Sequence, residues 1–187
     1  MVAPDFLTVK MGHAFDLLDA DGDGALTEAD HVLMGRRMAK ELNHAPHSPK
    51  EEALVDAYRR AWQEAHQQNA DSEGRITRAV YVSSVRDLFS DAELADQVCD
   101  RVLDSLMSIA DIDGTGELTP DAYRAYVLGQ SPSLASDKVD ESFRRVDRDG
   151  NGVISKAELK QAVVEYFTSS DPGAPGNWLF GPPPVAA

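Results

Sequence analysis

Oxygen-bearing side chains recur at alternate positions in four similar segments of the chain. These are DADGDGALTEAD (19–30), NADSEGRITRAV (69–80), DIDGTGELTPDA (111–122) and DRDGNGVISKAE (147–158). Each carries an acid, amide or hydroxyl at positions 1, 3 and 5, glycine at position 6 and an aliphatic residue at position 8. Calcium takes about six to eight oxygen ligands, which the alternate side chains of a tightly wound loop bring to one point. The spacing therefore predicts calcium loops, closed by the carbonyl at position 7 and a carboxylate at position 12.

Two of the loops have the full set of ligands expected of an EF-hand. Loop 4 offers Asp147, Asp149, Asn151, the Val153 carbonyl and Glu158, with Ser155 acting through water. Loop 1 offers Asp19, Asp21, Asp23, the Ala25 carbonyl, Thr27 and Asp30. Aspartate at position 12 is one methylene shorter than glutamate and reaches the ion with fewer oxygens. Because Mg²⁺ needs only six ligands, we expect loop 1 to discriminate less between calcium and magnesium than loop 4 does.

Loop 3 lacks the closing carboxylate. It offers Asp111, Asp113, Thr115 and the Glu117 carbonyl, but position 12 is Ala122. Asp121 stands one place early, and one residue of helix turns a side chain by about 100° away from the loop. Two interpretations follow: a weaker site completed by water or by the Glu117 side chain, or a loop kept only for architecture.

Loop 2 is predicted to bind no metal. Its position 12 is Val80, and Arg75 and Arg78 add positive charge near the expected cation position. The turn glycine and Ile76 are nevertheless present. In paired loops the residues at position 8 face each other across a short antiparallel link, so Leu26 should pair with Ile76 and Leu118 with Ile154. We expect loop 2 to hold loop 1 in shape.

Helices must flank every loop. Thr27, Thr77, Thr119 and Ser155 can cap the exiting helices, and apolar residues recur at helical spacing on both sides of the loops. Ser48–Glu51 and Ser90–Glu93 have the form of capping boxes, and Gly129 has the form of a helix stop. With no linker near residue 90, the sequence predicts an all-α, compact eight-helix globule in which four EF-hands form two packed pairs. The pairs span residues 1–90 and 91–168.

The last segment, 169–187, is rich in proline and glycine and contains the apolar run Trp178–Phe180. Large apolar side chains favour burial by about 1.5–3 kcal/mol each. One interpretation is a plug that docks into a cleft between the protein's own helices. A second is a ligand for a partner, with the run of prolines extended. A third is a disordered end.

The charge and composition of the chain limit the classes of partner that it can bind. The net charge is −14 and the pI is about 4.6, which disfavours nucleic acid and anionic membranes and suits cations or a basic peptide. The single cysteine, Cys99, fits a reducing compartment, and we find no secretory signal or membrane span, so we expect a cytoplasmic protein. His44 and His47 lack a third zinc ligand, and no catalytic set is visible, so we do not expect an enzyme.

Over residues 5–168 this arrangement resembles the sarcoplasmic calcium-binding proteins and their bacterial counterparts of the calerythrin type. The specific features are four loops beginning near the N-terminus, an inactive loop 2 and the tail motif PGNWLFG. The resemblance implies a compact fold, calcium in loops 1, 3 and 4, and a role as a buffer or transporter of cytoplasmic calcium. Ala122 and Asp30 depart from the loop pattern, at the third and first sites.

Two functions follow from these features. The first is a monomeric buffer that binds two to three calcium ions, with magnesium as a competitor in loop 1. The second is a sensor that opens on calcium and presents a groove to a helix of a target protein. Sensor grooves are rich in methionine, and the chain has only five methionines, which favours the buffer.

Overall fold

The structure, a computed structural model, describes residues 5–110 and 114–184. Over this part of the chain it is all-α, and it contains the eight helices that the sequence predicts. They are α1 (Phe6–Leu18), α2 (Glu28–Glu41), α3 (Pro49–Ala65), α4 (Arg78–Ser90), α5 (Ala92–Ala110), α6 (Pro120–Gln130), α7 (Ser136–Val146) and α8 (Lys156–Thr168). Two-residue strands and two 3-10 turns complete it: β1 (Ala25–Leu26), β2 (Ile76–Thr77), β3 (Glu117–Leu118), β4 (Ile154–Ser155), η1 (Gln67–Asn69) and η2 (Pro175–Trp178).

The strands join the loops in pairs. β1 pairs antiparallel with β2, with Leu26 opposite Ile76, and β3 pairs with β4, with Leu118 opposite Ile154. All four of these side chains are buried. The predicted pairing is confirmed, and loop 2 therefore lies directly beside loop 1.

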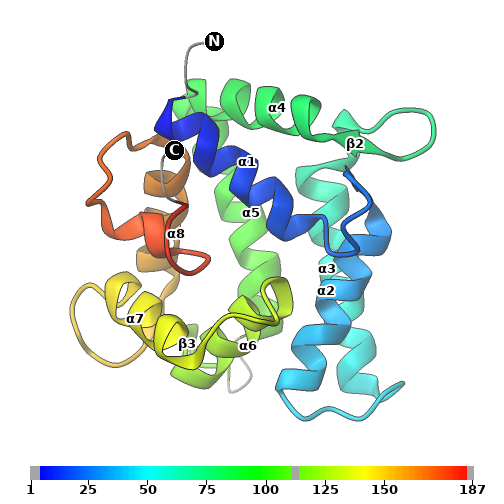
Figure 1. Ribbon diagram of the computed structural model, residues 1–187. Helices are drawn as coiled ribbons and strands as arrows, with labels where there is room; N and C mark the ends of the chain where they lie inside the picture. Colours follow the sequence, from blue (N-terminus) through cyan, green and yellow to red (C-terminus); the bar gives the residue numbers. More distant parts are fainter. Residues whose placement is uncertain (1–4, 111–113, 185–187) are drawn as a thin grey trace.

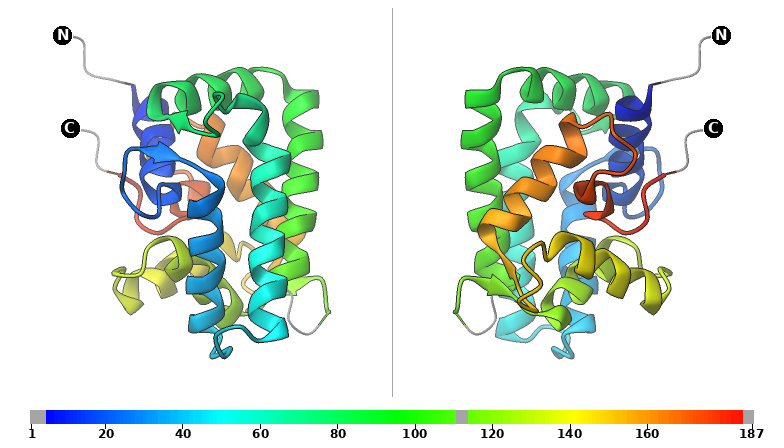
Figure 2. Two further views of the ribbon diagram at one scale, coloured as in Figure 1. Left: turned by 90° about the vertical axis from the view of Figure 1, so that its right-hand side faces the viewer. Right: turned by 90° about the vertical axis from the view of Figure 1, so that its left-hand side faces the viewer.

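The two halves share one core. α3 packs against α5 and α2 packs against α6, so contacts run across the predicted boundary near residue 90 (Figures 1 and 2). The boundary between the pairs stays a prediction. Gly129, expected to stop a helix, is instead buried inside α6. A Cβ there would lie 3.3 Å from the Met34 carbonyl oxygen, so glycine lets α6 approach α2 closely.

The two predicted capping boxes differ in outcome. Ser48 caps α3, since its hydroxyl accepts a hydrogen bond from the Glu51 amide at 3.2 Å. Ser90 does not cap α5, because it is the last residue of α4. Asp91 takes that place, and its Oδ1 accepts from the amides of Glu93 and Leu94 at 3.1 Å each. Aspartate is as good a cap as serine, so the start is displaced by one residue.

The tail folds back onto the body. η2 packs against α7 and α8 (Figures 1 and 2). Leu179 is fully buried, and the Tyr123 hydroxyl donates to the Leu179 carbonyl oxygen at 3.1 Å. The Phe180 ring meets the Tyr166 ring edge-on at 5.0 Å. In this structure Leu179 is part of the core, and Phe180 packs against it.

A buried lysine fastens the tail to the first helix. Lys10 on α1 is fully buried, and its Nζ donates to the carbonyl oxygens of Ser169 (2.7 Å) and Glu165 (3.3 Å) and to Asn177 Oδ1 (2.8 Å). Burial lowers the pKa of Lys10 to about 8, although Glu165 opposes the shift. Three oxygen acceptors compensate the buried charge and tie α1, α8 and the tail together.

Candidate metal centres

Loop 4 brings its predicted ligands to one place. Carboxylate oxygens of Asp147, Asp149 and Glu158 lie within 4.8 Å of one another. Asp147 accepts from the amides of Gly150 (2.9 Å) and Gly152 (3.0 Å), and Gly152 has φ +88°, a backbone conformation that favours glycine. These bonds wind the loop around its first aspartate.

Glu158 links the end of loop 4 to its start. Its Oε2 accepts from the Ser155 amide (2.9 Å) and hydroxyl (2.8 Å), and its Oε1 accepts from the Arg148 amide at 2.9 Å. Partial burial acts to raise the pKa of Glu158, but the hydrogen bonds from Ser155 and Arg148 outweigh it, and the pKa is lowered. The group is held as a carboxylate, the form that a cation needs.

Asn151 and Val153 lie next to these carboxylates in the chain. Asn151 Oδ1 accepts from the Val153 amide at 2.9 Å, which fixes the turn before β4. Val153 directly precedes that strand. The structure thus places the candidate ligands of loop 4 in a single turn of chain.

Loop 1 repeats this arrangement with one change. Carboxylate oxygens of Asp19, Asp21 and Asp23 lie within 4.8 Å of one another, and Asp19 Oδ2 accepts from the Gly24 amide at 2.9 Å. Asp30 is buried, and its oxygens accept from the amides of Asp21 (3.2 Å) and Thr27 (2.8 Å). Asp30 closes the loop as Glu158 does, but with the shorter side chain. Ala25 lies in β1.

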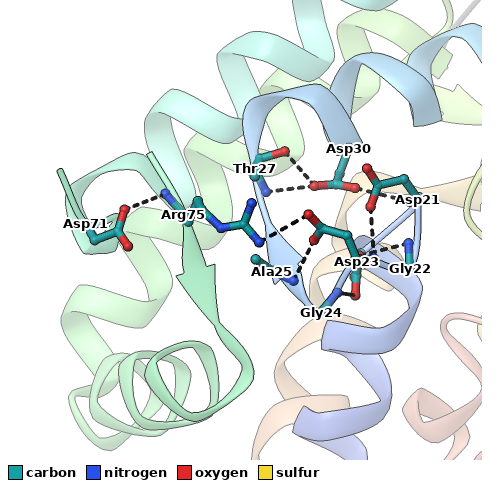
Figure 3. Close-up of polar contacts among 10 residues, drawn as sticks. Asp21, Gly22, Asp23, Gly24, Ala25, Thr27, Asp30, Asp71 and Arg75 are labelled. Atoms are coloured by element: carbon teal, nitrogen blue, oxygen red, sulfur yellow. Dashed lines mark hydrogen bonds and ion pairs between the residues drawn. The ribbon is translucent and has the colours of Figure 1, made fainter. Parts of the chain in front are cut away.

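A residue of loop 2 also enters this site. Arg75 Nη2 lies 3.1 Å from Asp23 Oδ2, and Figure 3 shows the guanidinium reaching from the residue before β2 to Asp23. The sequence placed Arg75 near the cation position of its own loop, and this contact was missed. The predicted pairing of Leu26 with Ile76 contained the signal, because it puts the residues flanking Ile76 next to loop 1.

The rest of loop 2 forms a turn like that of loop 1. Gly74 has φ +75°, and Asp71 Oδ1 accepts from the amides of Glu73 (2.9 Å) and Arg75 (3.0 Å), which lowers the pKa of Asp71. Val80, at position 12, is 40% exposed and offers no oxygen from its side chain. Asp71 thus holds the backbone turn, through its side chain and its main chain.

Loop 3 is described only in part. Asp111 and Asp113 lie outside the described residues. Glu117 begins β3, opposite Ser155, and Thr115 lies in the preceding turn. Ala122, at position 12, is buried, whereas Asp121 is exposed on the other side of the helix start. The weaker site and the architectural loop both stay predictions for loop 3.

The donors of loops 1 and 4 fit calcium. Each site gathers three carboxylates, and all their side-chain donors are oxygens, which hard divalent cations prefer. Asp147, Asp149, Asn151 and Glu158 would hold an ion in loop 4, and Asp19, Asp21, Asp23 and Asp30 would hold one in loop 1.

One further cluster lies outside the loops. Ligand atoms of His47, Glu51 and Glu52 lie within 4.8 Å of one another, while His44 is not a member. Glu51 Oε2 already accepts from the His47 amide, and His47 is largely exposed. The cluster belongs to the start of α3, where it shapes the turn before the helix.

Across residues 5–110 and 114–184, each helix is too short or too polar to cross a bilayer.

Comparison with known proteins agrees with this geometry. EF-hand family patterns match residues 138–166 ("EF hand domain") and 11–29 ("EF hand"), which contain loop 4 and most of loop 1. Calerythrin of Saccharopolyspora erythraea is 27% identical over 84% of this chain and 89% of its own length. The sarcoplasmic calcium-binding protein of Perinereis vancaurica tetradentata is 29% identical over 70% of this chain and 74% of its own.

Among solved structures, the calcium-loaded apo form of the coelenterazine-binding protein from Renilla muelleri superposes with a TM-score of 0.81. It is 23% identical, and the match covers 94% of this chain and 95% of that one, so it shows the fold alone. The matched sequences, the eight-helix fold and the two oxygen-lined loops lead to one conclusion. This chain is an EF-hand calcium-binding protein related to calerythrin and the sarcoplasmic calcium-binding proteins.

Proposed function

We propose that this protein is a calcium buffer that uses loops 1 and 4, with loop 3 as a third and weaker site. Magnesium competes in loop 1, where the closing residue is Asp30. The converging carboxylates of both loops support ion binding. The proposal includes a monomeric, cytoplasmic protein with no catalytic activity. Its net charge of −14 disfavours nucleic acid and anionic membranes as partners.

One observation carries the choice of a buffer over a sensor. The apolar tail is already docked, with Leu179 fully buried among the helices. Within the described residues, the large hydrophobic side chains that are exposed are Val80 and Leu94. A sensor needs a broad apolar surface for its target, whereas here the docked tail covers apolar side chains of the body.

A specific contact favours the sensor as a second candidate. Arg148 of loop 4 pairs with Glu165 at 2.6 Å, and Glu165 Oε2 also accepts from the Gly176 amide of the tail at 2.9 Å. Glu165 therefore links loop 4 directly to the tail. A sensor would use this connection to release the tail.

The two functions separate in a calcium titration of the metal-free protein, with magnesium present and a dye that fluoresces on apolar surfaces. A buffer gives a flat or falling dye signal, because the tail stays docked while calcium binds. A sharp rise would show that calcium exposes a surface and would refute the buffer. Glu158→Gln is the matched variant: it should lose calcium at loop 4 and leave the dye signal of the metal-free protein unchanged.

A further inference from the structure

A positively charged side chain of loop 2 contacts a candidate ligand of loop 1. Arg75 stands at position 7 of loop 2, and its Nη2 lies 3.1 Å from Oδ2 of Asp23, the position-5 ligand of loop 1 (Figure 3). About two fifths of each side chain is exposed. A loop predicted to bind no metal thus supplies a positive charge to the loop beside it.

The strand register puts Arg75 there. β1 and β2 pair with Ala25 opposite Thr77 and Leu26 opposite Ile76. Arg75 directly precedes β2, and its amide donates to Asp71 Oδ1 at 3.0 Å, which fixes the backbone from which the side chain extends. The strand pairing and this hydrogen bond therefore fix the position from which the Arg75 side chain reaches Asp23.

The charges around loop 1 give this contact a consequence. Asp19, Asp21 and Asp23 hold carboxylate oxygens within 4.8 Å of one another, and they repel one another when no metal is bound. A guanidinium on Asp23 relieves that repulsion in the metal-free loop. Once a divalent ion is bound, the same guanidinium faces a like charge.

We propose that Arg75 is an internal counterion of loop 1, which stabilises the metal-free loop and weakens its affinity for calcium. The inference rests on the proposed binding of calcium at loop 1. The degenerate loop 2 then has two duties: its strand shapes loop 1, and its arginine sets how tightly loop 1 binds.

The other pair of loops offers a comparison. Loop 3 pairs with loop 4 as loop 2 pairs with loop 1. The counterpart of Arg75 is therefore Glu117, at position 7 of loop 3. An acid in that place adds no positive charge near the loop 4 ligands. Calcium at loop 4 should therefore escape the penalty that Arg75 imposes at loop 1.

Two backbone amides can report on the sites separately by NMR. The Gly24 amide donates to Asp19 in loop 1, and the Gly152 amide donates to Asp147 in loop 4. Calcium titrations of the full-length wild type, Arg75→Gln, Arg75→Lys and Arg78→Gln would follow both signals. Arg78 is the matched control because it pairs with Asp16, before loop 1, so its loss changes the net charge equally without touching a candidate ligand.

Arg75→Gln should raise the calcium affinity of loop 1, followed at the Gly24 amide, by about fivefold or more, which is the lower end of typical coupling between sites. The calcium affinity of loop 4, followed at the Gly152 amide, should stay unchanged. The substitution should also lower the melting temperature of the metal-free protein, because the carboxylates of loop 1 lose their counterion. Removal of a residue that only supports the loop would instead weaken calcium binding. Arg75→Lys keeps the charge and should retain the wild-type affinity. Arg78→Gln should change the affinity less than Arg75→Gln does.

Weaker calcium binding in Arg75→Gln would overturn the inference and make Arg75 a residue that positions Asp23 as a ligand. Equal effects of Arg75→Gln and Arg78→Gln would also overturn it, because net charge alone would then explain the change. The proposed function is tested separately by the wild type. If its Gly24 signal ignores calcium, loop 1 binds no calcium, and the role of Arg75 falls with it.

Discussion

At the scale of single residues, loops 1 and 4 differ most at position 12. Glu158 belongs to the set of converging carboxylates in loop 4, whereas the set in loop 1 is Asp19, Asp21 and Asp23. Both residues accept hydrogen bonds from the cap of their helix: Asp30 from the Thr27 amide (2.8 Å) and hydroxyl (2.7 Å), and Glu158 from the Ser155 amide (2.9 Å) and hydroxyl (2.8 Å). Capping therefore does not distinguish them, and the difference lies in the side chain of Asp30, which is one methylene shorter and reaches less far toward a metal ion.

Asp30→Glu should therefore strengthen calcium binding at loop 1. The added methylene lets the carboxylate approach with both oxygens, and ligand number tunes EF-hand affinities over several decades, so we expect a gain of about tenfold. Magnesium should gain less, because it needs only about six ligands. Competition between the two ions, followed at the Gly24 amide, measures both effects. A loss of calcium affinity would instead show that loop 1 is built around aspartate.

The turns of loops 1 and 4 could be predicted because they are local, whereas the ligand roles of their residues stay a prediction. Glycine at position 6 and oxygens at positions 1, 3 and 5 specify a turn within a dozen residues, and the structure forms that turn in loops 1 and 4. The predicted pairing of Leu26 with Ile76 indicated only that Arg75 lies near loop 1, and the contacts of Arg75 with Asp23 and of Lys10 with Asn177 were not predictable as local patterns. They join residues far apart in sequence, and their partners are set by strand register and helix packing.

At the scale of elements, the tail contributes to stability. The sequence predicted that the apolar run Trp178–Phe180 seeks burial, but left open whether it docks on the protein itself or on a partner. In the structure Leu179 is fully buried, while Trp178 lies under the Arg145 guanidinium, 4.7 Å from its carbon to the ring centroid. Tertiary packing alone decides which of these adjacent side chains enters the core.

Leu179→Ala should cost about 2–5 kcal/mol in the free energy of unfolding, the usual range for deleting a buried leucine side chain. Urea unfolding monitored by circular dichroism measures this loss. Leu94→Ala, at a leucine that is 45% exposed, is the control and should change stability little. Similar costs for the two variants would mean that the tail is not docked in solution. Leu179→Ala should also raise the dye signal of the metal-free protein, because it loosens the tail.

At the scale of the whole molecule, one cluster of rings joins three helices of the first half. His31 on α2, Trp62 on α3 and His66 after α3 lie within 5.4–6.0 Å of one another between ring centroids, and His66 lies 5.7 Å from Tyr81 on α4. Burial lowers the pKa of His31 to about 4, and burial together with the neighbouring His31 lowers the pKa of His66 to about 3. Folding therefore keeps both imidazoles neutral.

This neutrality makes the stability of the fold depend on pH. An unfolded chain protonates these histidines near pH 6.5, well above their pKa values in the folded state. Below that pH the unfolded state binds more protons than the folded state, so the free energy of unfolding falls as the pH falls. Each histidine contributes a slope of at most about 1.4 kcal/mol per pH unit between its two pKa values.

His66→Gln should remove its share of that slope. Urea unfolding of the metal-free protein at several pH values from 7 down to about 5 would give a shallower fall in stability than the wild type, whatever the constant cost of the substitution. His47→Gln, the same substitution at a side chain that is 85% exposed, is the control. If the curves of His66→Gln and the wild type run parallel, His66 titrates alike in both states. The ring cluster would then be open to water, and the packing of α2, α3 and α4 would differ from that seen here.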